Sequence, residues 1–334
     1  TLVLMSFSGP MGTGITGTLT GFIGNAGRIP VDGYGLIQLS SKLGVEIIAA
    51  VALPLLLLML AAIAGNMIQH RLVWSADGKR IYFTAGDRSW TSVFAFDVAS
   101  ATYKKLTNRQ LLGGLSFSKD GSRVAMTMQS SMEPSDVYVA DPSFASPKRL
   151  THVNPQLENF ALGETDVITW KSTDGQEVEG VLLKPVGYQQ GKRYPMLVEP
   201  HGGPTGAHNA GFKANWGSPG QYWAGRGWAV FYPNPRGSTG YGEKFMRGNI
   251  LDWGGGDYRD IMTGVDAIVS RGIADSAKLA VAGWSYGGYM TSWTISQTTR
   301  FKAARMGAGL TNLESMYGTT DIPGYIGAFF DGPP

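Results

Sequence analysis

The chain has 334 residues, with 28 Lys and Arg against 25 Asp and Glu and a net charge of +3. It is long enough for more than one domain and too weakly charged to predict a nucleic-acid partner. The absence of cysteine excludes disulfides, thiolate zinc sites and a cysteine nucleophile. No motif for a cofactor or metal is present, and the four histidines are His70, His152, His201 and His208.

A long apolar segment lies near the start of the chain. Ile47–Ile68 runs for 22 residues without a charged side chain. A membrane core about 30 Å thick needs about 20 such residues, so the pattern predicts a transmembrane helix and a membrane protein. A buried helix of a soluble protein is the alternative. In that case we expect a cytoplasmic or periplasmic location.

A repeat follows at residues 73–153. Both copies contain short alternating strands and an Asp-Gly turn, which is typical of β-propeller blades. The matched positions are Asp77 with Asp120, Asp97 with Asp141 and Thr107 with Thr151, at offsets of 43, 44 and 44. We therefore predict two blades. Propellers usually need 4–8 blades to close, so most of such a ring is expected to be absent.

Residues 154–334 alternate between strand-like and helix-like segments. Strands are predicted at residues 166–170, 176–183, 196–199, 228–232, 279–282 and 303–306. A helix is predicted from Asp257, as its N-cap, to Gly272. This order predicts a parallel sheet with its functional site at the carboxyl ends of the strands.

The most informative stretch is Leu279–Met290, in which an apolar run meets a Gly-x-Ser-x-Gly sequence and then a helix-like segment. A serine on such a strand-to-helix turn projects its hydroxyl above the sheet edge. Gly283 and Gly287 leave room for close packing around the turn. A glycine-rich turn without chemistry is the alternative interpretation of these five letters alone.

Four motifs place this serine in a wider pattern. They are His201–Pro204, Asn234–Gly242, Asp252–Gly254 and Gly283–Tyr289. With them, residues 73–334 resemble the prolyl oligopeptidase family of serine peptidases, nearest to its acylaminoacyl-peptidase and dipeptidyl-peptidase-like branch. The resemblance implies an α/β-hydrolase domain at residues 154–334, with a propeller that restricts entry. It also implies hydrolysis of short peptides or acyl-aminoacyl bonds through an acyl-enzyme.

The resemblance also assigns roles to individual residues. Ser285 is the expected nucleophile, and the backbone N–H groups of Tyr286 and Gly203 are the expected oxyanion donors. His201 opens the loop that carries Gly203, and we expect it to support that loop. A role for His201 as the base is the alternative.

The expected catalytic triad is incomplete in this sequence. In α/β-hydrolases the order along the chain is Ser, then Asp or Glu, then His. No histidine follows Ser285, and Asp321, by resemblance, lies in a loop before the strand of the triad aspartate; Asp331 also follows Ser285. We expect both partners to lie beyond Pro334, the chain to be a C-terminally truncated fragment or a chimera, and the 334 residues alone to be inactive.

Residues 1–75 resemble a different protein, the membrane component of the flagellar type III export switch. The similarity is most specific between Gly65 and Ser75. It predicts a membrane segment at residues 1–72 and a join near residues 73–75. Two alternatives to a peptidase therefore stay open: a membrane component of flagellar protein export, and a non-catalytic membrane-tethered binding module. The oligomeric state is left open.

Overall fold

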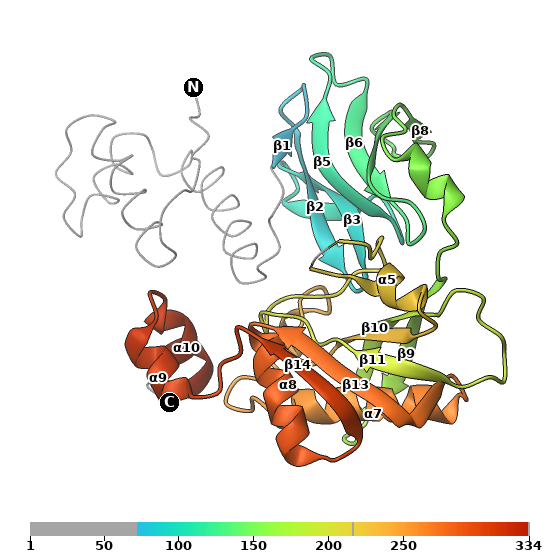
Figure 1. Cartoon of the computed structure of the whole chain (residues 1–334). Helices are drawn as coiled ribbons and strands as arrows, with labels where there is room; N and C mark the ends of the chain where they lie inside the picture. The colour runs from blue at the N-terminus through green and yellow to red at the C-terminus, as the bar shows by residue number, and fades with distance from the viewer. Residues whose placement is uncertain (1–71, 216, 333–334) are drawn as a thin grey trace. The chain divides into compact units, whose positions relative to one another are not determined.

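The computed structural model describes residues 72–215 and 217–332 (Figure 1). These residues fall into two compact units, which divide between Thr311 and Asn312. The predicted span Ile47–Ile68 and almost all of the export-like segment lie outside the described residues, so both stay predictions. Among the described helices, none has the length and apolarity that crossing a membrane requires.

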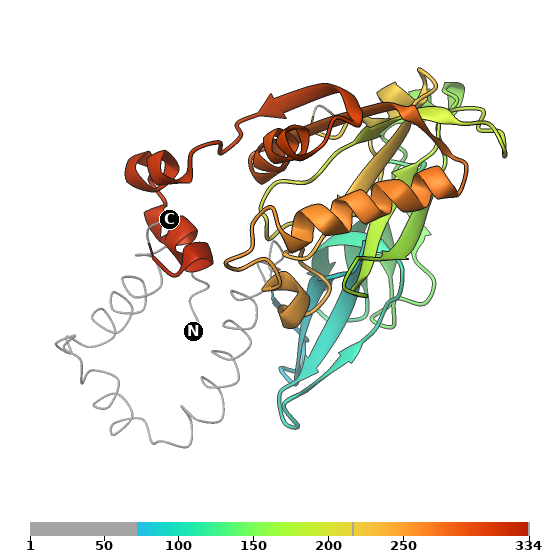
Figure 2. The ribbon, with the colours of Figure 1, turned by 90° about the horizontal axis from the view of Figure 1, so that it is seen from below.

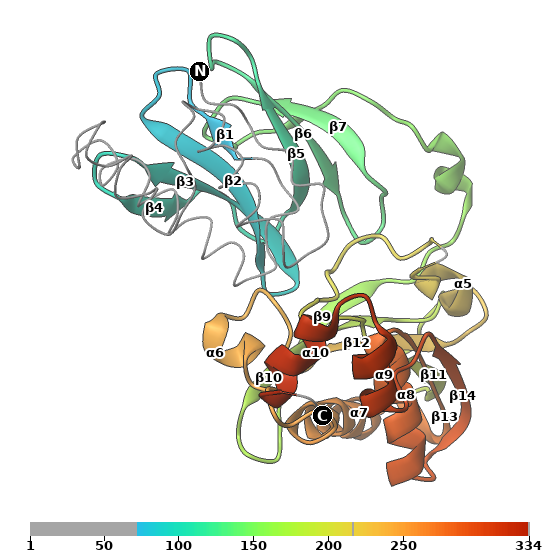
Figure 3. The same ribbon diagram turned by 90° about the vertical axis from the view of Figure 1, so that its left-hand side faces the viewer.

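The two sequence repeats form two four-stranded antiparallel sheets (Figure 3). The first contains β1 (Val73–Trp74), β2 (Arg80–Asp87), β3 (Trp90–Asp97) and β4 (Thr102–Lys105). The second contains β5 (Leu111–Phe117), β6 (Val124–Gln129), β7 (Asp136–Ala140) and β8 (Lys148–Arg149). One apolar core joins them, built from Tyr82, Val93, Ala95, Leu112, Val124, Met126, Ala140 and Phe144. The predicted pair of blade-like units is therefore present, and no closed ring is formed by the described residues.

The repeats also share their turn chemistry. In the first, Ser75 Oγ donates to Asp77 Oδ1 over 2.6 Å, and in the second Ser118 Oγ donates to Asp120 Oδ1 over the same 2.6 Å. Each aspartate also accepts a backbone N–H two residues further on. These bonds stabilise the charged carboxylate and lower the pKa of Asp120 to about 2. The Asp-Gly turns are thus held by interactions that are local in the sequence.

A six-stranded sheet follows, after the short 3-10 helix η2 (Pro155–Asn159). Its strands are β9 (Thr165–Lys171), β10 (Glu177–Leu183), β11 (Tyr194–Val198), β12 (Ala229–Asn234), β13 (Ala274–Trp284) and β14 (Phe301–Gly307), in the spatial order β14-β13-β11-β12-β10-β9. The four strands from β11 to β14 are parallel. However, β10 pairs antiparallel with both β9 and β12, so the sheet is mixed and the prediction of a parallel sheet was only partly right.

Four helices accompany this sheet: α5 (Gly220–Ala224), α6 (Glu243–Met246), α7 (Gly256–Ser270) and α8 (Tyr286–Gln297). Figure 2 shows the long α7 crossing one face, where it contacts β9, β10, β12 and β13. The N-cap of α7 is Gly255, so the prediction of Asp257 as N-cap was wrong. Asp257 instead lies in the first turn with its side chain buried.

The remaining described residues, 312–332, belong to the other compact unit and contain α9 (Leu313–Thr319) and α10 (Pro323–Phe330). Asp321 is exposed between these helices. Asp331 follows α10 with a left-handed backbone, φ 55°. The loop expected around Asp321 is therefore short, because Pro323 already begins a helix.

The packing of α7 on the sheet predicts the effect of a methyl group at Gly264. A Cβ there would come within 2.7 Å of ring atoms of Phe231 and Trp170. Alanine normally favours a helix over glycine by about 1 kcal/mol, but overpacking a core costs about 1–3 kcal/mol. We expect Gly264→Ala to lower the free energy of unfolding in urea. The control is Gly318→Ala in α9, where a Cβ would meet nothing within 4 Å and should stabilise. A stabilised Gly264→Ala variant would contradict the packing described.

Candidate active site

Ser285 lies between the end of β13 and the start of α8. Its backbone is in a left-handed conformation, with φ 58° and ψ −124°, which is uncommon for a residue with a side chain. Its N–H donates to Gly307 O over 2.9 Å, and its own carbonyl accepts from Tyr289 N over 2.9 Å. These bonds fix the turn to β14 and to the first turn of α8. Backbone strain of this kind costs about 1–3 kcal/mol and typically marks functional sites.

The glycines around Ser285 permit close backbone contact. A Cβ on Gly283 would lie 2.2 Å from Gly287 O, and one on Gly287 would lie 2.2 Å from Pro200 O. Both distances are far below any real contact, so neither position has room for a side chain. The turn therefore depends on glycine for space, as the sequence pattern predicts.

The loop after β11 runs beside the serine. A Cβ placed on Gly202 would lie 3.4 Å from Ser285 Cβ and 4.0 Å from Ser285 Oγ. The next residue is Gly203, with φ 133°. The structure therefore places Gly202, the residue before Gly203, beside Ser285, and Tyr286 at the first position of α8.

The histidine of this loop, His201, is engaged by the loop itself. Its Nδ1 lies 2.7 Å from Gly202 O and its Nε2 lies 2.9 Å from Ser238 Oγ. The Ser238 hydroxyl also lies 2.6 Å from Pro235 O, and its single proton can serve only one of the two acceptors at a time. Burial lowers the pKa of His201 to about 4, so the ring is neutral near pH 7. These contacts favour a loop-supporting role over a role as base.

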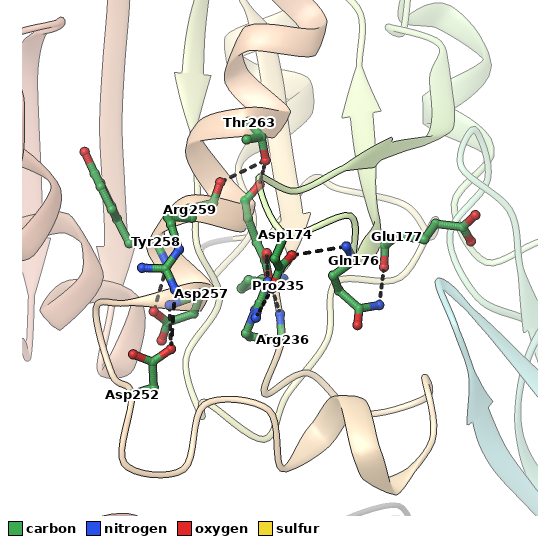
Figure 4. A network of polar contacts seen from close by, with 12 residues as sticks. Asp174, Gln176, Glu177, Pro235, Arg236, Asp252, Asp257, Tyr258, Arg259 and Thr263 are labelled. Atoms are coloured by element: carbon green, nitrogen blue, oxygen red, sulfur yellow. Dashed lines mark hydrogen bonds and ion pairs between the residues drawn. The ribbon is translucent and has the colours of Figure 1, made fainter.

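A polar network holds the segment after β12, which supplies Ser238 (Figure 4). The Arg236 guanidinium binds Asp260 through Nε and Nη2 over 2.9 and 2.7 Å, and Asp174 through Nη1 over 2.8 Å. The carboxylate of Asp260 is fully buried. Thr239 N then donates to Gly206 O over 2.9 Å. Arg236 thus anchors to α7 the segment that supports the loop beside Ser285.

The turn between β2 and β3 contacts the same segment. Arg88 N donates to Gly240 O over 2.9 Å, and Ser89 N donates to Glu179 Oε1 over 3.0 Å. The buried Glu179 carboxylate also accepts from the Tyr241 hydroxyl over 3.0 Å. The tip of the first four-stranded sheet is therefore bonded to loops of the six-stranded sheet's domain.

Charged groups behind the loop are perturbed by burial. Burial raises the pKa of Glu199 to about 7 and lowers that of Lys213 to about 8. His208 donates from Nε2 to the Glu199 carbonyl over 2.8 Å, and its pKa lies well below its usual value because it is buried. His208 is thus also occupied in holding the loop.

No role was predicted from the sequence for Arg236, Asp260 or Glu179, and Asp257 was predicted only as an N-cap. Arg236 lies in a quoted motif, Asp257 and Asp260 follow one, and Glu179 lies in a predicted strand, but their partners are distant in the chain. The sequence feature that could have pointed to Arg236 is its place in the Asn234–Gly242 segment, because a polar segment after a buried strand marks the carboxyl edge of a sheet.

Comparisons with known proteins match parts of this chain to peptidases. Residues 217–331 match the sequence profile of the Prolyl oligopeptidase family. The chain is 31% identical over 260 residues to the uncharacterized peptidase YuxL of Bacillus subtilis, a match that covers 77% of this chain and 39% of that protein. It is 32% identical over 202 residues to dipeptidyl-peptidase 5 of Schizosaccharomyces pombe, covering 56% of this chain and 29% of that protein.

The fold is similar to that of the acylaminoacyl peptidase of Pyrococcus horikoshii. The two structures superpose with a TM-score of 0.67 at 26% identity, covering 76% of this chain and 40% of the archaeal chain. The chain thus spans less than half of the length of each of these relatives. The resemblance to prolyl oligopeptidases therefore extends to both sequence and fold, whereas the flagellar resemblance of residues 1–75 stays a prediction.

The Arg236 network predicts a large loss of stability when the arginine is removed. Arg236→Gln leaves the buried Asp260 carboxylate without its ion pair, and breaking a buried pair costs about 3–5 kcal/mol. We expect that loss in urea unfolding. The control is Arg259→Gln, because Arg259 is exposed and lies 3.8 Å from the partly exposed Asp252. Exposed pairs contribute about 0–1 kcal/mol. Equal effects of the two changes would contradict the anchoring role of Arg236.

The neutral His201 predicts a pH-dependent stability. Between pH 6.5 and about 4 the unfolded state binds a proton at His201 that the folded state does not, so stability falls as the pH is lowered through this window. The loss amounts to at most about 3 kcal/mol. We expect His201→Gln to flatten this part of the pH profile in urea unfolding. A profile that keeps its slope in His201→Gln would show that the histidine is not held neutral.

Proposed function

We propose that this chain is part of a serine peptidase of the prolyl oligopeptidase family, with Ser285 as its nucleophile. The observation that carries the proposal is the left-handed Ser285 at the junction of β13 and α8, with the Gly202–Gly203 loop against its side chain. The matches to peptidases in sequence and fold support the same reaction class.

In the proposed reaction, Ser285 Oγ attacks the carbonyl carbon of a peptide bond while a general base takes the hydroxyl proton. The oxyanion that forms accepts hydrogen bonds from the N–H groups of Tyr286 and Gly203. Such donors contribute about 3–4 kcal/mol each. The C–N bond then breaks, the amine leaves with the proton from the base, and water hydrolyses the acyl-enzyme.

Among the described residues, no histidine is placed to act as the general base for Ser285. The side chains of His152, His201 and His208 are bonded to Glu158, to Gly202 and Ser238, and to Glu199, respectively. We propose that the base and its orienting carboxylate follow Ser285 in chain order, as they do in α/β-hydrolases, and are not among the described residues.

Short peptides or acylated amino acids are the proposed substrates. The relatives named as dipeptidyl and acylaminoacyl peptidases support this class. The two blade-like sheets support it as well, because a capping propeller would restrict entry to small substrates. Flagellar export and a non-catalytic membrane-tethered module depend on residues 1–71, which lie outside the described structure, and no observation on the described residues favours either.

The proposal predicts how the 334-residue chain reacts with a fluorophosphonate probe. Loss of the triad's function lowers turnover by a factor of about 10⁶, with about 10³–10⁴ over water left to the oxyanion hole and binding. We expect slow labelling that mass spectrometry maps to Ser285 and that Ser285→Ala abolishes. Labelling should persist in His201→Ala.

Two results would contradict the proposal. Rapid, stoichiometric labelling of Ser285 that is lost in His201→Ala would identify His201 as the base and overturn the assignment of its role. Labelling that stays unchanged in Ser285→Ala would overturn the assignment of the nucleophile. A chain extended beyond Pro334 through further strands of the sheet should label much faster.

A further inference from the structure

The side chain of Tyr286 is held at its far end by a buried carboxylate. The ring is 2% exposed and packs against Trp253 and Tyr289, with centroids 4.8 and 5.5 Å away. Its hydroxyl donates to Asp257 Oδ2 in a short hydrogen bond, and Asn249 Nδ2 lies 3.5 Å from the same hydroxyl. The residue that begins α8 is therefore tied to the start of α7.

Burying the carboxylate of Asp257 at this position costs free energy. It is fully buried, and its Oδ1 accepts from Tyr258 N over 2.7 Å. The ion pairs of Arg236 are formed with Asp260 and Asp174 and not with Asp257. Burial raises the pKa of Asp257 to about 6, with a small further effect from Asp252 and Asp260, while the bond from Tyr286 opposes the shift. Near neutral pH the group is a carboxylate whose charge is stabilised by the N-terminal turn of α7 and by the Tyr286 hydroxyl.

We propose that Asp257 is a positioning residue, which fixes the first turn of α8 through the Tyr286 hydroxyl and thereby aims the Tyr286 N–H at the reacting carbonyl oxygen. The oxyanion-binding role of the Tyr286 N–H rests on the proposed function. The restraint of the turn by the hydrogen bond to Asp257 does not. Tyr286 is thus held at both ends, by the strained Ser285 on its backbone side and by Asp257 at its hydroxyl.

The physical reason lies in the tolerance of an oxyanion hole. Its donors act only when they are held within about 0.5 Å and 10–20° of the productive geometry. Ser285, with φ 58°, is in a conformation that the chain would leave unless its surroundings fix it. The bond to Asp257 supplies such a restraint at the residue whose N–H does the work, without occupying that N–H.

Hydrogen exchange of the α8 N-terminal turn tests the tie without any need for activity. We expect Tyr286→Phe and Asp257→Asn to accelerate amide exchange severalfold in a peptide covering residues 285–292, as measured by mass spectrometry on the full chain. The matched control is Tyr289→Phe, which removes a hydroxyl from the same aromatic cluster and leaves the bond between Tyr286 and Asp257 in place. It should exchange like the unmodified chain.

The pH dependence of this exchange gives a second readout. The hydrogen bond from Tyr286 lowers the pKa of Asp257, so breaking that bond while Asp257 stays buried lets the carboxylate take up a proton more readily. Opening of the turn is therefore favoured as the pH is lowered through about 6, and protection of the turn, corrected for intrinsic exchange, should fall. Asp257→Asn should remove that dependence. The other ionisable groups that face Asp257 are Asp252, Asp260, Tyr258, Tyr286 and Tyr289. Of these, the carboxylates are unchanged in the variant.

The rate at which the fluorophosphonate labels Ser285 tests whether the bond between Asp257 and Tyr286 affects the reaction as well as the rigidity of the turn. With prolonged incubation, we expect Tyr286→Phe to label Ser285 about tenfold more slowly than the unmodified chain, less than the 10²–10³ lost with a whole donor. Unchanged exchange in Tyr286→Phe would overturn the proposal. Accelerated exchange with an unchanged labelling rate would overturn the positioning role. If the unmodified chain does not label at Ser285 at all, the proposed function fails, and exchange still decides whether Asp257 fixes the turn.

Discussion

The close approach of three backbone segments at the Ser285 turn is the constraint on which the candidate site depends. Gly287 lies against Pro200 O from the loop after β11, and Gly288 lies so close to Gly307 O at the end of β14 that a Cβ would be 2.4 Å away. Neither position can hold a side chain unless the ends of the parallel strands move apart. Because the segments meet here, the loop that carries Gly203 lies beside the serine, and α8 begins immediately after it.

Hydrogen bonds and ion pairs of neighbouring side chains hold the segments that surround the Ser285 turn. Arg236 ties the segment after β12 to α7, Ser238 contacts His201, and Thr239 bonds to the loop beside the serine. Asp257 separately holds the hydroxyl of Tyr286. Two carboxylates of α7 thus hold two different segments of the same site. Their burial costs free energy, which is consistent with a demand for accurate positioning.

The sequence predicted the features that depend on neighbouring residues. The Asp-Gly turns of the two repeats are formed by contacts within a few residues, so their letters are sufficient to find them. The letters of the Gly-x-Ser-x-Gly turn also marked its place, although its geometry depends on the distant Pro200 and Gly307. The turn at residues 173–175 indicated that β9 and β10 pair with each other, but the antiparallel pairing of β10 with β12 was not predicted, because alternating residues show that a strand is present but not how its neighbours run. Asp257 was taken for an N-cap because a buried acid in a helix's first turn has the same local pattern. The bond between Arg236 and Asp260 joins residues 24 apart, and no local signal marks it.

A crystal structure of the protein with a phosphonate bound to Ser285 would test the central claim most directly. The account predicts that the phosphoryl oxygen, which stands for the oxyanion, lies within about 3 Å of the backbone nitrogens of both Tyr286 and Gly203. The ring of His201 should keep its contacts to Gly202 and Ser238. A phosphoryl oxygen directed away from both nitrogens, or bonded to the His201 ring, would contradict the assignment of this turn as the catalytic site of a serine peptidase.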